Sequence, residues 1–212
     1  MYTRRSITSC TVALLGGLGL LFAAADAAHA QKLSLAPTIG LYIPTSELIK
    51  AANGDEFRQE VSLSVGGRIG FWLGSRVGFE ATAQYAPSAL TFSAAGLSEE
   101  ASVNILTGSG RLAFFIVPES QPLAILVSGG VGVIDRSGEA FADVENTRDI
   151  TGTAGASARL RVGRIIHLQV NIEDYIYTPG FASAPGVEGQ IQHDIQLSFG
   201  VGIPLLGLGS GS

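Results

Sequence analysis

Cysteine is almost missing from this chain of 212 residues, since Cys10 is its only example. A single cysteine excludes a disulfide framework and a metal site built from several thiolates. Histidine is also scarce, with three examples. Although 46% of the residues are hydrophobic, no apolar run after residue 30 reaches the roughly 20 residues of a membrane-spanning helix. The hydrophobic residues must therefore follow a pattern other than that of an apolar helix.

The first thirty residues have the three parts of a secretory signal peptide. Arg4 and Arg5 form a positive start, residues 11–25 are apolar, and Ala28-His29-Ala30 matches an A-x-A cleavage site. The apolar stretch is short for a helix that crosses a bilayer. We therefore expect residues 1–30 to be removed by cleavage after Ala30, so that Gln31 becomes the mature N-terminus.

Acidic residues outnumber basic ones in the chain that remains. The whole chain has 13 basic and 18 acidic residues, of which Arg4, Arg5 and Asp26 lie in the expected signal peptide. The mature chain therefore has 11 basic and 17 acidic residues and a net charge of −6. A protein that binds nucleic acid usually presents a basic face. The composition therefore predicts no nucleic-acid partner.

Large apolar residues alternate with small or polar ones through the rest of the chain. The first run extends from Leu33 to Ile43, and a period of two is that of a β-strand with one apolar face. Seven further runs cover residues 60–73, 76–85, 102–117, 122–135, 148–162, 164–177 and 190–204. A change of phase near Ile105 predicts a β-bulge.

Eight such runs predict an all-β fold, an eight-stranded antiparallel up-and-down transmembrane β-barrel over residues 31–205. Residues 206–212 are expected to form a short Gly/Ser tail. Short connections at Gly74, 118–121 and Gly163 alternate with long ones at 44–59, 88–101, 136–147 and 178–189. Short turns at one rim and long loops at the other are the layout of an outer-membrane barrel. We expect the short-turn rim to face the periplasm and four long loops to lie outside the cell.

The charged residues of the runs indicate which face lies inside. Those that share the parity of the small and polar residues include Arg68, Glu80, Arg111, Arg159, Arg161 and Glu173. A charge that faces hydrocarbon costs a few kcal/mol, so we expect these six to lie in the interior. We expect all of them except Arg161 to form a polar network there. A soluble lipocalin-like barrel would have an apolar interior instead.

Parity also predicts partners within this network. A turn of residues 73–75 would place Arg68 directly opposite Glu80, close enough for an ion pair. The alternative is that Arg68 pairs across the interior with Glu173 while Arg111 serves Glu80. The sequence leaves both arrangements open.

The mature chain has two histidines, and neither has the neighbours of a catalytic group. A turn centred on Gly163 would place Arg159 opposite His167. His193 precedes Asp194, but adjacent residues of a strand point to opposite faces. Neither histidine has the H-x-S arrangement of barrel lipid deacylases, and the acidic loops lack the spacing of a calcium site. We therefore expect no catalytic residue, no cofactor and no metal site.

The last run ends in residues 193–199, His-Asp-Ile-Gln-Leu-Ser-Phe, which looks like a C-terminal strand recognised by the barrel assembly machinery. With this segment and the pattern over residues 31–205, the chain resembles the small eight-stranded outer-membrane barrels of the OmpA, OmpX and OmpW-like kind. Their last strand usually ends at an aromatic residue, whereas this chain continues to Ser212. The resemblance implies an exported, monomeric outer-membrane protein whose partners are outer-membrane lipids and the assembly machinery.

Eight strands enclose a space that side chains fill. This predicts a structural or surface-interaction role through the four loops. A narrow channel for small or apolar solutes is the alternative, and a lipid-modifying enzyme is a third, less favoured one.

Overall fold

The computed structural model describes residues 31–45, 49–50, 56–94, 97–142, 147–163, 166–179 and 191–208. The expected signal peptide, residues 1–30, lies outside the described residues. None of the helices in the described ranges is long and apolar enough to span a membrane.

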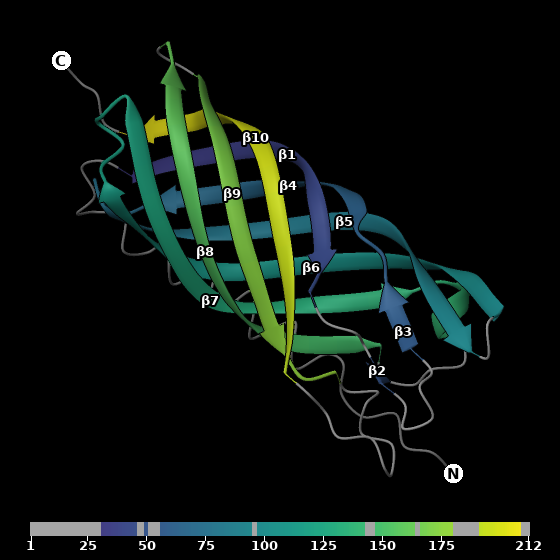
Figure 1. The fold of residues 1–212 in the computed structure, drawn as a ribbon. Helices are drawn as coiled ribbons and strands as arrows, with labels where there is room; N and C mark the ends of the chain where they lie inside the picture. Colours follow the sequence, from purple (N-terminus) through teal and green to yellow (C-terminus); the bar gives the residue numbers. More distant parts are fainter. Residues whose placement is uncertain are drawn as a thin grey trace, which may run out of the picture.

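The described strands form one closed sheet (Figure 1). Eight strands make the wall of a barrel: β1 (Gln31–Pro44), β4 (Ser62–Trp72), β5 (Val77–Ala94), β6 (Leu97–Val117), β7 (Leu123–Ser137), β8 (Arg148–Val162), β9 (Ile166–Tyr177) and β10 (Gln192–Leu208). Wall strands that are neighbours in the chain pair antiparallel, and β1 pairs with β10 to close the barrel. The predicted eight-stranded antiparallel barrel is confirmed.

The alternation in the sequence becomes the two faces of this wall. In β9, Gln169 and Asn171 are buried inside the barrel, whereas the side chains of Val170 and Ile172 are 49% and 48% exposed on the outside. A period of two places every second side chain on the same face of a strand. The polar residues therefore line the interior and the apolar residues form the outer surface.

The prediction of a long loop at residues 88–101 is wrong. Strands β5 and β6 stay paired up to Ala94 and Leu97, so this segment is a strand hairpin that extends beyond the rest of the wall (Figure 1). The short strands β2 (Ile49–Lys50) and β3 (Glu56–Gln59) add to it, because β3 pairs with β5. Its Ser, Ala and Gly residues are typical of a loop, but a neighbouring strand is available to pair with the backbone.

The other expected loops are partly described. The connection at 136–147 contains the short 3-10 helix η2 (Glu139–Phe141), and most of 178–189 lies outside the described residues. Strand β10 continues to Leu208, past the predicted end of the last run at residue 204.

The β-bulge predicted near Ile105 is absent from the β5–β6 and β6–β7 ladders at that residue. The side chain of Ile105 is instead fully buried and points into the barrel. A register shift in β6 lies farther along, between Phe115 and Val117. The change of phase in the sequence therefore marks an apolar patch in the interior.

Apolar side chains fill parts of the interior toward both rims. One cluster contains Tyr42, Ala86, Val103, Ile105, Ile134, Phe141, Tyr175 and Tyr177. The other contains Trp72, Ala113, Phe115, Ala124 and Leu126. The described ends Gln31 and Leu208 pair with each other, and they lie at the rim of the second cluster, where the chain makes its short turns.

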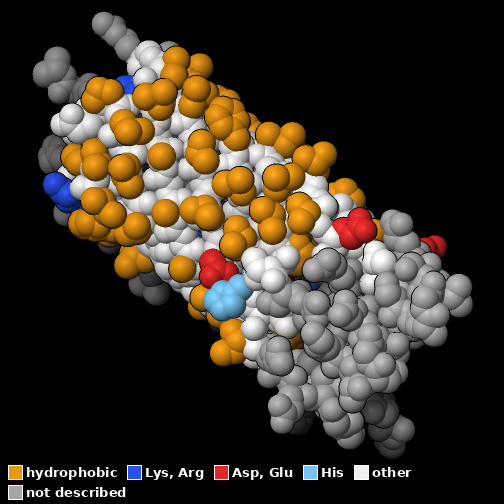
Figure 2. All heavy atoms as spheres, viewed as in Figure 1, with side chains coloured by type: hydrophobic (Ala, Val, Ile, Leu, Met, Phe, Trp, Pro, Cys, Tyr) orange, Lys and Arg blue, Asp and Glu red, His pale blue; other side chains and the backbone are white. Residues whose placement is uncertain are grey.

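Apolar side chains cover the face of the wall that Figure 2 shows, and exposed large apolar residues lie on each of the eight wall strands. At the end opposite the short turns, outward ion pairs limit this apolar surface: Arg148 Nη2 lies 2.5 Å from Asp135 Oδ2, and His193 Nδ1 lies 2.9 Å from Asp174 Oδ2. Between these pairs and the short-turn rim, the outward positions of the described wall strands carry no charged side chain. This distribution matches a barrel whose outer surface lies in hydrocarbon.

Candidate functional site

Five of the six charged residues predicted for the interior lie together in one cluster, which we call the central network. The prediction was wrong for the sixth, Arg161, which is exposed at the short-turn rim. Arg68 Nη1 donates to Glu80 Oε2 at 2.7 Å, and Arg159 Nη2 donates to Glu80 Oε1 at 2.6 Å. Arg68 also donates to Glu173. Arg111 Nη2 donates to Glu173 Oε1 at 2.9 Å and lies 3.9 Å from Glu80 Oε2. The two pairings that the sequence left open therefore coexist.

Five strands supply this network, since its members come from β4, β5, β6, β8 and β9. Their side chains are at most 3% exposed. Three guanidinium groups share two carboxylates, so every carboxylate has more than one cationic partner. A buried charge is tolerated only when it is paired and hydrogen-bonded. The network therefore fills the interior with groups that depend on one another.

The predicted direct opposition of Arg68 and Glu80 is wrong. Glu80 lies opposite Gly70 in the β4–β5 ladder, and it reaches Arg68 diagonally. The connecting turn is displaced by one residue, because the hydrogen bond that closes it joins Leu73 N to Val77 O at 2.9 Å and leaves residues 74–76 in the turn in place of 73–75. The resulting displacement is two residues along the strand, which keeps every side chain on its predicted face.

The predicted opposition of Arg159 and His167 is wrong for a similar reason. Arg159 lies opposite Gln169, and His167 lies opposite Arg161. The last pair before the turn is Val162 with Ile166, so the turn is not centred on Gly163.

A second buried network, which sequence reasoning missed, lies next to the first apolar cluster. Arg136 Nη1 donates to Asp149 Oδ2 at 2.8 Å, and Arg136 Nη2 lies 3.4 Å from Asp194 Oδ2. Asp194 also accepts hydrogen bonds from Tyr42 and from Tyr177, the latter at 2.6 Å. The signal was present in the sequence, because the alternation of the run at 122–135 continues by one residue to an inward Arg136.

The short-turn end of the interior is closed by aromatic rings. The ring centroids of Trp72 and Phe115 are 4.4 Å apart, and the guanidinium carbon of Arg159 lies 4.9 Å and 5.4 Å from them. At the other side of the central network, the Tyr175 hydroxyl donates to Glu173 Oε2 at 3.3 Å. Aromatic side chains therefore contact the central network on both of its sides along the interior.

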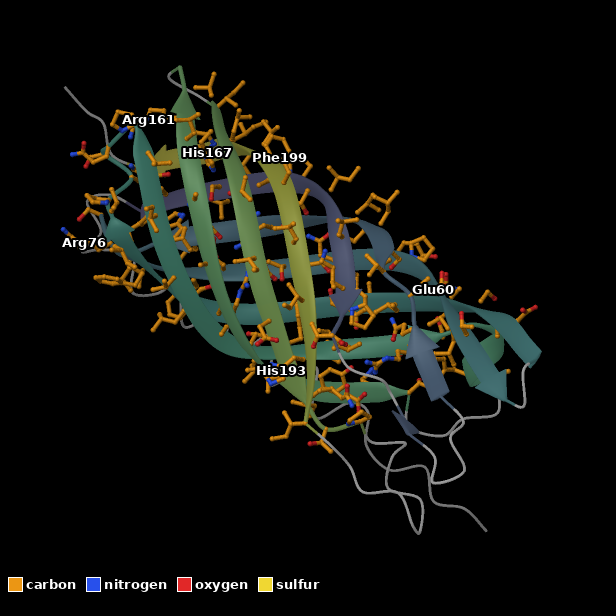
Figure 3. The ribbon with its side chains drawn as sticks, in the orientation of Figure 1. Glu60, Arg76, Arg161, His167, His193 and Phe199 are labelled. Atoms are coloured by element: carbon orange, nitrogen blue, oxygen red, sulfur yellow. The ribbon has the colours of Figure 1, made fainter. Side chains whose placement is uncertain are left out.

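The two histidines lie far apart, near opposite ends of the barrel (Figure 3). His193 contacts Asp174 on the outer surface, whereas Asp194 points inward. Among the described residues, no group of three or more His, Cys, Asp or Glu side chains is placed to hold a metal ion.

No protein-family model matches the chain, and no curated protein sequence matches it. Solved structures do match. The outer membrane protein OprG from Pseudomonas aeruginosa aligns with a TM-score of 0.66 and 11% identity, over 84% of this chain and 97% of that one. Neisserial surface protein A (NspA) aligns with a TM-score of 0.48 and 9% identity, over 83% and 97%. The attachment invasion locus protein Ail of Yersinia pestis aligns with a TM-score of 0.42 and 9% identity, over 83% of this chain and 99% of that one.

The fold and the packed interior define the chain as a small eight-stranded β-barrel of the outer-membrane type. The likeness to OprG shows this fold, and it confirms at that level the resemblance that the sequence indicated.

Proposed function

We propose that the protein is an integral outer-membrane barrel with a filled interior, which has a structural or binding role at the cell surface. The observation that carries the proposal is the central network, whose buried ion pairs join five strands across the interior. An eight-stranded barrel is just wide enough for side chains to fill it. Function is then left to the groups that the barrel presents at its ends.

The end opposite the short turns is the better candidate for such contacts. It carries the β5–β6 hairpin with β2 and β3, and the connection that contains η2. Binding residues are often found on connections that a rigid scaffold positions. One of the four loops expected from the sequence is thus replaced by a strand hairpin, which offers a surface built on paired strands.

The route to the membrane follows from the same proposal. It includes export by residues 1–30, with cleavage after Ala30. It also includes insertion through the assembly machinery by way of β10 and a monomeric state in outer-membrane lipid. The apolar outer surface supports placement in lipid.

Planar-bilayer recording tests whether the interior is filled. We expect the purified protein to give no steady conductance steps, because the described interior side chains occupy the barrel in successive layers. A wide porin reconstituted in the same way is the positive control. Reproducible open steps from this protein would favour the narrow-channel function instead.

A separate measurement tests the enzyme alternative. An unchanged lipid A mass in cells that express the protein is expected of a barrel with no lipid-modifying activity.

A further inference from the structure

A cavity of about 550 Å³ opens at the short-turn rim, away from the surface that the proposed function uses. Trp72 and Arg159, which close the interior, are part of its lining. Arg161 and His167 also line it and lie near each other at this end (Figure 3). A volume of this size is in the range of small-molecule sites.

The charged part of the lining is mainly cationic. It has the side chains of Lys32, Arg159 and Arg161 against a single carboxylate, Glu119. This carboxylate is already engaged, since its Oε2 lies 3.5 Å from Lys32 Nζ, and its backbone oxygen accepts a hydrogen bond from Arg161. The cavity therefore keeps an excess of positive charge.

Buried donors without partners lie in the same lining. Arg159 is 3% exposed and donates through Nη2 to Glu80, but its Nε and Nη1 have no hydrogen-bond partner. Trp72 is 1% exposed, and its Nε1 also has no partner. Buried donors are nearly always satisfied, and a guanidinium forms its strongest hydrogen bonds with an oxyanion.

The remaining lining is largely apolar. Its apolar members are Leu33, Pro122, Ala124, Ile166, Pro204 and Leu205, and Ser34, Gln121 and Gly163 lie among them. Ile166 and Leu205 are also exposed on the outer surface. The apolar residues suit a hydrocarbon group, whereas the arginines suit an anion. We propose that the cavity binds a small amphipathic organic anion, with its carboxylate or phosphate on Arg159 and Arg161 and its hydrocarbon body against the apolar wall.

The chain contains one tryptophan, so its tryptophan fluorescence comes entirely from Trp72, which lines this cavity. The exported protein would be reconstituted in phosphatidylcholine nanodiscs and titrated with hexanoate, hexyl phosphate and the neutral 1-hexanol. We expect a saturable change with an anion and a much weaker response to hexanol. Tighter binding of hexanoate would show that the site prefers a carboxylate, and tighter binding of hexyl phosphate would show that it prefers a phosphate. Either result supports the proposed site.

The variant Arg161→Gln should raise the dissociation constant about tenfold, the effect of one lost charge-assisted hydrogen bond. It leaves the central network intact, which Arg159→Gln would not. Arg76→Gln is the matched control, because Arg76 lies at the same rim outside the cavity lining and should bind with unchanged affinity. Equal responses to hexanol and to both anions, or equal affinities of the Arg161→Gln and Arg76→Gln variants, would overturn the proposal.

Discussion

Replacing Glu80 by alanine will lower the free energy of unfolding of the barrel by about 3–5 kcal/mol. Glu80 accepts hydrogen bonds from Arg68 at 2.7 Å and Arg159 at 2.6 Å and lies 3.9 Å from Arg111. Without it, Arg159 loses the carboxylate that it contacts, and Arg68 and Arg111 share the single carboxylate of Glu173. The expected loss comes mainly from these uncompensated charges and only in part from a lost contact.

Reversible unfolding in lipid or detergent, followed by the fluorescence of Trp72, measures this change. Glu60→Ala is the control, because Glu60 is exposed at the end of the barrel and accepts one side-chain hydrogen bond, from Thr91. We expect it to shift the free energy by no more than about 0.5 kcal/mol. A double-mutant cycle with Arg68→Ala should show a coupling of about 0.5–3 kcal/mol. Purely additive effects would mean that Arg68 and Glu80 do not interact.

An arginine on the outer surface should be nearly as damaging. Leu197 is 39% exposed on β10, and it lies opposite the apolar Leu41 and Ile172 on the neighbouring strands. For Leu197→Arg we expect a loss of about 2–4 kcal/mol in a lipid-refolded barrel, because the charge would face hydrocarbon. The other outward mid-strand positions Leu63, Ile69, Val127 and Leu168 should behave alike.

The matched control for this substitution is Ile191→Arg. Ile191 precedes β10 and is 66% exposed, and it lies beyond the outward pair of His193 and Asp174. Near the interface the loss should fall to about 0–1 kcal/mol. Comparable losses for the two variants, measured by unfolding in bilayers, would contradict the assignment of the outer surface to lipid.

Face and strand number follow from alternation, which is why they could be predicted from residues such as Leu197 and Gln196. Each side chain of a paired strand faces either the interior or the outside, so a pattern with a period of two determines its side. The members of the central network were found in this way. Their side chains point into the barrel in every register that keeps this alternation.

Pairing registers could not be predicted, because they depend on the exact position of each turn. Leu73 pairs with Val77 and Val162 pairs with Ile166, so both turns are centred one residue later than the sequence suggested. A shift of the centre by one residue moves the register by two and leaves the faces unchanged. The hairpin at 88–101 was missed because its strand pairing is supplied by neighbours, and its composition alone is typical of a loop.

The second network was missed for a different reason. Arg136 was placed in a loop because its run was ended at residue 135, although Asp149 and Asp194 lay on predicted inward positions. Three-dimensional proximity of β7, β8 and β10 brings these residues together. Sequence alone gives the parity of each residue but not its height in the barrel.

Site-directed spin labelling tests the central claim, a barrel whose outer surface lies in lipid, most directly. Single cysteines would be placed at outward positions of β9, in a Cys10→Ser background, and the protein reconstituted in bilayers. The positions are Leu168, Val170 and Ile172. We predict that labels there are accessible to oxygen and shielded from a water-soluble nickel reagent, while a label at Ile191 is accessible to nickel. Nickel accessibility at all three β9 positions would show that water surrounds the wall and would contradict the account.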